Sequence, residues 1–129
     1  KTRSLKKVEK ELDDAWSELV KLRAGNQCEI CHKPTQLNSH HIFSRAKKSV
    51  RWDAKNGVCL CVGHHIGNVF SAHKTSFEFS MWLLSLKGKT FMDELAWKSG
   101  QTSHLSLFEK ELLLNELKEE IKKIKLNLL

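Results

Sequence analysis

Residues 28–65 read CEICHKPTQLNSHHIFSRAKKSVRWDAKNGVCLCVGHH, and they contain all four cysteines of the 129-residue chain and five of its seven histidines. Two residues separate Cys28 from Cys31, and two separate Cys61 from His64. These two hooks together supply three thiolates and one imidazole, which is a tetrahedral ligand set typical of structural zinc. The spacing therefore predicts a structural Zn²⁺ bound by Cys28, Cys31, Cys61 and His64.

Cys59 is the alternative to His64 as the fourth ligand, because in a strand it would share a face with Cys61. We prefer His64, since a Cys-x-Cys hook is the less usual zinc geometry. Buried free thiols and disulfides are the competing interpretations of the four cysteines. Free thiols leave the spacing unexplained, and disulfides are unusual in a chain that shows no secretory signal.

Both ends of the chain are predicted to form long helices. Apolar residues recur in steps of three and four over residues 5–22 and 107–128, and a capping box of Ser106 and Glu109 precedes the second run. Each apolar stripe needs a partner, because an isolated helix of this length is marginal in water. We expect the stripes to pair antiparallel within one chain or across a homodimer.

The sequence pattern changes in the centre of the chain. Residues 37–42 and 57–60 are short, partly β-branched runs that predict two strands joined by a basic loop. A capping-box pattern of Thr75 and Glu78 then opens a helix that ends at Lys87-Gly88, and residues 91–97 predict one more short helix.

These elements predict an α+β protein with a zinc-stabilised core and long flanking helices. We expect one domain over residues 1–129, with an N-terminal helix (1–25), a metal-bearing core (26–75) and a helical C-terminal part (76–129). The first residue is not Met, and we expect a trimmed form or a piece of a longer protein.

The net charge of +7 is concentrated in the centre, where residues 26–75 carry seven Lys and Arg against two acids. A local positive field attracts polyanions, of which nucleic acid is the commonest. We expect Arg45, Lys47, Lys48 and Arg51, in the loop between the strands, to contact DNA phosphates. Because no apolar run approaches the roughly 20 residues of a membrane span and no signal peptide is visible, we expect a cytoplasmic protein without a membrane partner.

The order of the polar motifs resembles that of the HNH, or ββα-metal, endonucleases. Over about residues 26–70 the resemblance is carried, in chain order, by Cys28-x2-Cys31, Ser39-His40-His41-Ile42, Asn56 and Leu60-Cys61-x2-His64-His65. Within that superfamily, residues 50–56 and Gly67-Asn68 resemble the phage recombination nucleases of the NinG (Rap) type. The resemblance implies a phage-encoded enzyme that acts in the cytoplasm of a bacterial host.

The resemblance also implies roles for five residues. His41 would be the general base, and Asn56 would brace the base and its loop. His40 and His65 would bind a divalent cation, Mg²⁺ or Mn²⁺, and His73 would complete that site. His64 stands where the family usually has a fourth cysteine.

The chemistry of phosphodiester hydrolysis gives an independent reason for this set. The reaction needs an activated water and stabilisation of charge on the phosphate and the departing 3′ oxygen, which one neutral His and one cation provide together. We therefore expect a metal-dependent DNA endonuclease, with branched recombination intermediates as the implied substrate.

Two other classes compete with the enzyme. One is a non-catalytic zinc-containing nucleic-acid-binding module, and the other is a structural partner protein built on its heptad helices. Retention of both His41 and His65 argues against the first, because binding alone needs neither. The density of metal-ligating residues argues against the second.

Overall fold

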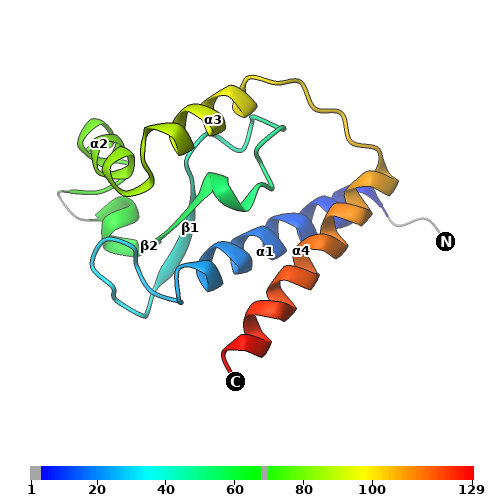
Figure 1. The fold of residues 1–129 in the computed structure, drawn as a ribbon, viewed down its shortest axis with the longest axis horizontal. Coiled ribbons are helices and arrows are strands. Elements are labelled where there is room, and N and C mark those ends of the chain that lie inside the picture. The colour runs from blue at the N-terminus through cyan, green and yellow to red at the C-terminus, as the bar shows by residue number, and fades with distance from the viewer. Residues whose placement is uncertain (1–3, 68–69) are drawn as a thin grey trace.

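The computed structural model describes residues 4–67 and 70–129, in which four α-helices surround one two-stranded sheet (Figure 1). The helices and strands are α1 (Leu5–Arg23), β1 (Leu37–His41), β2 (Gly57–Cys61), α2 (Ser76–Lys87), α3 (Lys89–Ser99) and α4 (Leu107–Asn127). This mixture of helices with a small sheet confirms the α+β class. Asn68, which belongs to the resemblance to the NinG type, lies outside the described residues.

The two strands pair antiparallel, with Leu37 opposite Cys61 and His41 opposite Gly57. Helix α1 packs so closely on one face of this sheet that a Cβ atom at Gly57 would overlap the side chain of Val20. Only glycine fits at this point, because any other residue would push α1 away from the strand.

The sheet separates two apolar cores, because neighbouring residues of a strand point to opposite faces. In β2, Cys59 packs in the core formed with α1 and α4, whereas Val58 and Leu60 pack in a second core with Phe79 and Leu83 of α2. The same alternation in β1 decides where the adjacent histidines lie. His41 faces α1, and His40 faces α2.

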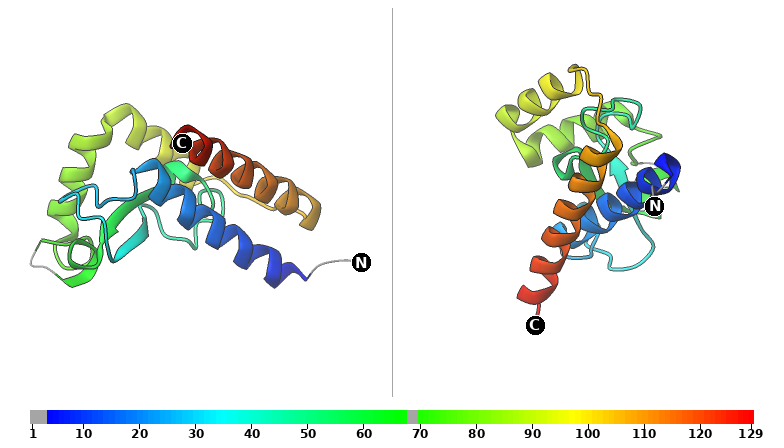
Figure 2. Two further views of the ribbon diagram at one scale, coloured as in Figure 1. Left: turned by 90° about the horizontal axis from the view of Figure 1, so that it is seen from below. Right: turned by 90° about the vertical axis from the view of Figure 1, so that its right-hand side faces the viewer.

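The apolar stripes of α1 and α4 pack on each other within one chain, and their buried members are Val8, Leu12, Ala15 and Leu19 of α1 with Leu114, Leu117 and Ile121 of α4. The predicted antiparallel arrangement is wrong. Lys110 at the start of α4 pairs with Glu9 near the start of α1 at 2.8 Å, and Lys125 near the end of α4 pairs with Glu18 at 2.7 Å. The helices are therefore parallel, with their first turns at the same end of the molecule (Figure 2).

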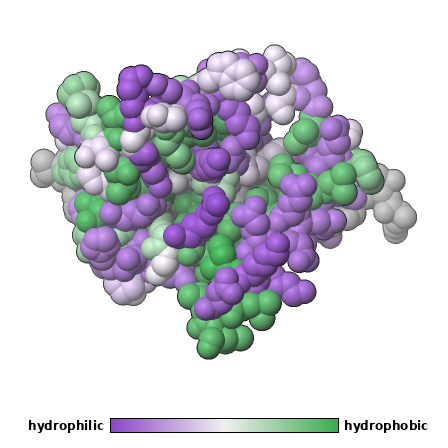
Figure 3. Space-filling view, viewed as in Figure 1, coloured by the Kyte–Doolittle hydropathy of each residue, from purple (hydrophilic) through white to green (hydrophobic). Residues whose placement is uncertain are grey.

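The end of α4 extends past this seam. Apolar side chains gather at the C-terminal tip (Figure 3), where Leu126 is 60% and Leu128 is 68% exposed. None of the helices within residues 4–67 and 70–129 is long and apolar enough to cross a membrane.

One of the two predicted capping boxes is formed, and the other is not. The box of Ser106 and Glu109 is formed at the start of α4, with both of its hydrogen bonds. The box predicted for Thr75 and Glu78 is not formed, because the Thr75 hydroxyl instead donates to the carbonyl of Ser71 at 3.0 Å. Thr75 thereby stabilises the turn before α2 and not the first turn of the helix.

A further feature that the sequence did not predict lies between β2 and α2. The chain forms one π-helical turn there, η2 (Gly63–Gly67), and α2 begins at Ser76. Glycine at both ends of this turn disfavours its extension into an α-helix. The turn sends its two histidines in different directions, as described below.

Candidate metal centres

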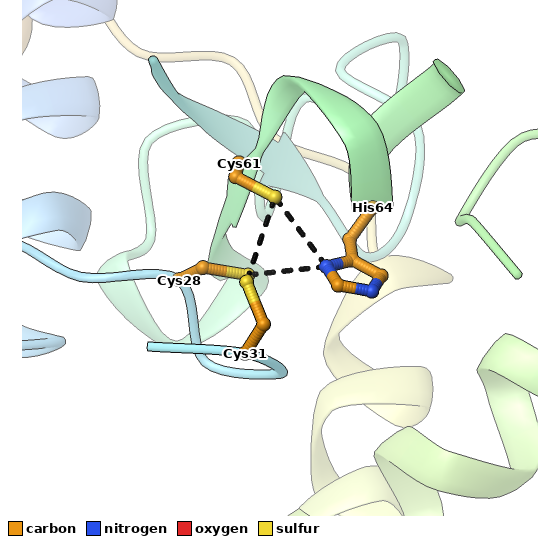
Figure 4. A group of neighbouring side chains, drawn as sticks. All are labelled: Cys28, Cys31, Cys61 and His64. Carbon is orange, nitrogen blue, oxygen red and sulfur yellow. Dashed lines mark hydrogen bonds between the residues drawn. The ribbon is translucent and has the colours of Figure 1, made fainter. Parts of the chain in front are cut away.

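The first candidate centre joins the loop after α1 to the end of β2. The ligand atoms of Cys28, Cys31, Cys61 and His64 all lie within 4.8 Å of one another, and the side chains turn toward a common point (Figure 4). These are the four residues that the hook spacing predicts. A Cys3His cluster that could bind a structural metal is therefore present in the fold.

The separations in this cluster fit a tetrahedral metal. With Zn–S bonds of about 2.3 Å and Zn–N bonds of about 2.0 Å, tetrahedral ligands lie roughly 3.8 Å (S to S) and roughly 3.5 Å (S to N) apart. The Sγ atoms of Cys31 and Cys61 are 3.8 Å apart, and His64 Nδ1 lies 3.4 Å from Cys61 Sγ and 3.7 Å from Cys28 Sγ. The donor set is thus arranged for a zinc-sized ion.

Local backbone structure prepares the first hook. The N–H of Cys28 donates to the carbonyl of Lys33, and the N–H of His32 donates to the carbonyl of Cys28, with His32 in the left-handed region at φ 64°. Burial raises the pKa of the Cys28 thiol, but hydrogen bonds from the backbone of Cys31 and Cys61 outweigh it and lower the pKa to about 6. A thiolate, the form that binds metal, is accordingly accessible at neutral pH.

Cys59, the alternative ligand, lies away from this cluster. Its side chain is fully buried in the core shared with α1, where burial raises the pKa of the thiol to about 11. Glu29, which sequence reasoning did not assign, connects the hook to the strand, because its side chain accepts a hydrogen bond from the N–H of Cys59 at 2.8 Å.

The second candidate centre consists of His40 in β1, His65 in η2 and His73 in the turn before α2. Their ligand nitrogens also lie within 4.8 Å of one another, and the Nε2 atoms of His65 and His73 are 3.2 Å apart. The N–H of His73 donates to the carbonyl of His65 at 3.2 Å, which holds the turns together. His40 and His65 are half-buried, and His73 is exposed.

The electrostatics of this centre favour neutral imidazoles. Burial, with a smaller contribution from His65 and His73, lowers the pKa of His40 to about 4. Burial and the neighbouring His73 also lower the pKa of His65. Neutral rings keep the lone pairs that a cation needs, and three nitrogen ligands favour Mn²⁺, Ni²⁺ or Zn²⁺ over Mg²⁺ in affinity.

His41 lies on the opposite face of β1. Its ring stacks on Trp16 of α1, with centroids 3.8 Å apart and planes 8° from parallel, and its Nε2 lies 3.1 Å from the carbonyl oxygen of Arg51. A carbonyl can only accept, so Nε2 carries the proton and Nδ1 keeps the lone pair of the neutral ring. Burial lowers the pKa of His41, which extends the neutral form to lower pH.

Asn56, in the short turn η1 (Ala54–Asn56) before β2, is fully buried and braces the loop between the strands. Its side-chain oxygen accepts from the N–H of Phe43 at 2.8 Å, and its amide group donates to the carbonyls of Phe43 and Val50. These three hydrogen bonds join the Asn56 side chain to the loop and not to His41. Any influence of Asn56 on His41 would therefore pass through the backbone of this loop.

The four basic residues of the loop divide into two pairs. Lys47 and Lys48 are exposed. Arg45 and Arg51 both pair with Asp13 of α1, at 2.9 Å and 2.8 Å. Asp13 and Trp16 were not predicted from the sequence as residues of the site. The helical period places them on one face of α1, but it does not show which strand this face meets.

No protein-family model matches this chain, and no curated protein or solved structure matches it either. The fold and its geometry define the protein as an α+β protein with a Cys3His cluster and a three-histidine cluster beside one small sheet. The interpretation of these clusters therefore depends on the chemistry of the chain's own residues.

Proposed function

We propose that this chain is a metal-dependent DNA endonuclease of the HNH, or ββα-metal, type. The observation that carries the proposal is the convergence of His40, His65 and His73 from three separate segments. The residue after His40 in β1 is His41, a histidine with a lowered pKa whose ring is oriented by a hydrogen bond. In this proposal the Cys3His cluster binds structural Zn²⁺, and the three histidines bind the catalytic Mg²⁺ or Mn²⁺. The substrate we propose is DNA, with branched recombination intermediates as its preferred form.

The three-histidine cluster fits a catalytic cation because it has fewer ligands than a closed structural site. Mg²⁺ and Mn²⁺ prefer octahedral coordination, so three protein ligands would leave coordination positions for phosphate and water. Charge developing on the scissile phosphate and on the departing 3′ oxygen would be stabilised by a cation bound there.

His41 is the proposed general base. Because its Nε2–H donates to the carbonyl of Arg51, its Nδ1 accepts the proton of the attacking water. The stacking on Trp16 limits rotation of the ring, which keeps the basic nitrogen in one orientation.

DNA binding is assigned to the exposed part of the basic loop. Lys47 and Lys48 are exposed, and the side chain of Arg45 is 59% exposed despite its pairing with Asp13. Lysine and arginine attract phosphates without reading sequence, so the affinity should fall as salt rises.

A comparison of single-histidine variants tests the proposal. In His41→Ala, nicking of plasmid and four-way-junction DNA in Mn²⁺ should fall by about 100-fold or more, because proton abstraction is lost. Zinc content, melting temperature and DNA affinity should persist. His104→Ala is the matched control, since His104 is exposed and belongs to neither cluster.

Two outcomes would contradict the proposal in different ways. A His41→Ala protein that cuts at the wild-type rate would exclude His41 as the base. Tight DNA binding by the wild-type protein without cleavage of any substrate would support the alternative, a non-catalytic zinc-containing nucleic-acid-binding module.

A further inference from the structure

Helix α1 lies outside the region of the HNH resemblance, yet one of its faces reaches the proposed active site. Asp13, Trp16 and Ser17 follow the i, i+3, i+4 spacing of a single helical face. Trp16 stacks on His41, and Ser17 bonds to Ser39, two residues before His41. The helix is therefore attached to β1 next to the proposed base.

Asp13 makes the most directional contacts of this face. Its carboxylate accepts from Arg51 Nε at 3.1 Å and from Arg51 Nη2 at 2.8 Å, which is the two-pronged geometry of an arginine–carboxylate pair. It also accepts from the indole nitrogen of Trp52 at 2.8 Å. Two consecutive side chains of the loop are thus held by one carboxylate.

These contacts fix the backbone at Arg51. The guanidinium is held by Asp13, the side chain is only 19% exposed, and the carbonyl of the same residue accepts from His41 Nε2. The next residue, Trp52, is buried. With side chains anchored on both sides of the 51–52 peptide, its carbonyl has little freedom to turn away from His41.

Trp16 provides the second constraint on the imidazole. Its ring is buried, and its Nε1 donates to the carbonyl of Asp53 at 2.8 Å, so the indole is itself fixed. His41 is consequently held by a planar contact on one ring face and by a hydrogen bond at one ring edge.

We propose that Asp13 is a positioning residue that acts through Arg51 to hold His41 in the Nε2-protonated tautomer, with Nδ1 free to accept a proton. This inference rests on the proposed function, because it assigns a purpose to the orientation of the base. It also separates the two arginines. Arg51 belongs to the chain of contacts from Asp13 to His41, whereas Arg45, which is more exposed, remains available to phosphate.

The primary test is the ring of His41 itself, observed by long-range ¹H–¹⁵N NMR on the zinc-loaded full chain at about pH 8, where imidazoles are neutral. The wild-type ring should show the Nε2-protonated tautomer alone. Asp13→Ala should produce a mixture of both tautomers. Asp14→Ala is the matched control, because Asp14 is the next residue of the same helix, is 66% exposed and, within the described part of the chain, pairs with Lys10 of α1.

Kinetics provide the second readout. If Asp13 orients the base, Asp13→Ala should lower kcat for nicking by between about tenfold and about 100-fold while KM changes less than about twofold. Because Asp13 acts through Arg51, the double variant Asp13→Ala, Arg51→Ala should be no slower than the slower of the two single variants. Asp14→Ala should nick at the wild-type rate.

Asp13→Asn guards against a folding defect, because it retains the size of the side chain and an acceptor for Trp52 while it removes the charge that holds Arg51. A folded Asp13 variant with the wild-type tautomer, or with the wild-type kcat, overturns the proposal. The proposal is also overturned if the losses of kcat in Asp13→Ala and Arg51→Ala are additive in the double variant. If the wild-type protein cleaves no DNA, the proposed function fails, and the NMR comparison alone then supports or overturns the positioning of His41 by Asp13.

Discussion

The two candidate metal-binding clusters lie beside the same strands but differ in donor chemistry and exposure. The Cys3His cluster has four ligands, three of them thiols, and Cys28 and Cys61 are buried. The three-histidine cluster has only nitrogen donors, and one of its members is exposed. Soft thiolates in a complete shell favour a permanent ion, whereas three imidazoles suit one that exchanges. This difference is the reason why we propose a structural metal for the Cys3His cluster and an exchangeable cation for the three-histidine cluster.

The largest expected effect comes from removing a thiol of the first cluster. Cys61→Ser should lose the bound zinc and about 5 kcal/mol or more of unfolding free energy, because metal binding contributes directly to folding. Elemental analysis and thermal melting measure both quantities. Cys59→Ala is the matched control and should retain one zinc per chain. A Cys61→Ser protein with unchanged melting would remove the structural half of the comparison.

The next effect concerns the pair of helices α1 and α4. This pair is a reference for the metal clusters, because neither candidate cluster includes a residue of these two helices. Leu12 is fully buried in the seam between α1 and α4, and Leu12→Asp should cost about 4 kcal/mol of unfolding free energy because it buries an unpaired charge. Leu126→Asp, on the exposed end of α4, should cost less than about 0.5 kcal/mol.

Denaturant unfolding measures these two costs, and light scattering reports the mass. Because the seam is filled within one chain, we expect a monomer. Equal costs for the two substitutions would show that the seam is not packed, and a doubled mass would support the homodimer.

A smaller effect should come from the second cluster. His65→Ala should lower the nicking rate by about tenfold or more without loss of zinc or melting temperature, because a ligand of the exchangeable cation is removed. Excess Mn²⁺ should restore part of the rate, since weaker binding is compensated by concentration. A titration of Mn²⁺ in the nicking assay distinguishes this defect from that of His41→Ala, which Mn²⁺ should not rescue. Loss of zinc in His65→Ala would show that the clusters are not independent.

The smallest effect is expected from pH. Burial lowers the pKa of His41 below its ordinary value of about 6.5, so the neutral, basic form persists to lower pH than in a free histidine. The nicking rate should therefore be flat near neutrality and decline only at a pH below the ordinary histidine pKa of about 6.5, as the ring is protonated. A rate that rises on acidification would contradict His41 as the base. The rate is measured with Mn²⁺ in excess, which keeps the cation site occupied.

Much of the local structure could be predicted from the sequence, because it depends on short spacings. The strands, expected at residues 37–42 and 57–60, lie at Leu37–His41 and Gly57–Cys61. The two hooks bring together the four ligands that their spacing predicts. The π-helical turn at Gly63–Gly67 could not be predicted, because His64 is directed to one cluster and His65 to the other, and this division depends on both sites at once.

The sequence by itself determined the ligand types, the helical stripes and the alternation of His40 and His41 across β1, because each follows from chemistry or from a fixed period along the chain. Only the tertiary structure decided that α1 and α4 run parallel, since an apolar stripe has no direction and the pairs Glu9–Lys110 and Glu18–Lys125 form only once the helices dock. It also decided that Asp13 meets Arg51, 38 positions further along the chain. Contacts over such separations depend on how the helix docks on the sheet, and no local period records that choice.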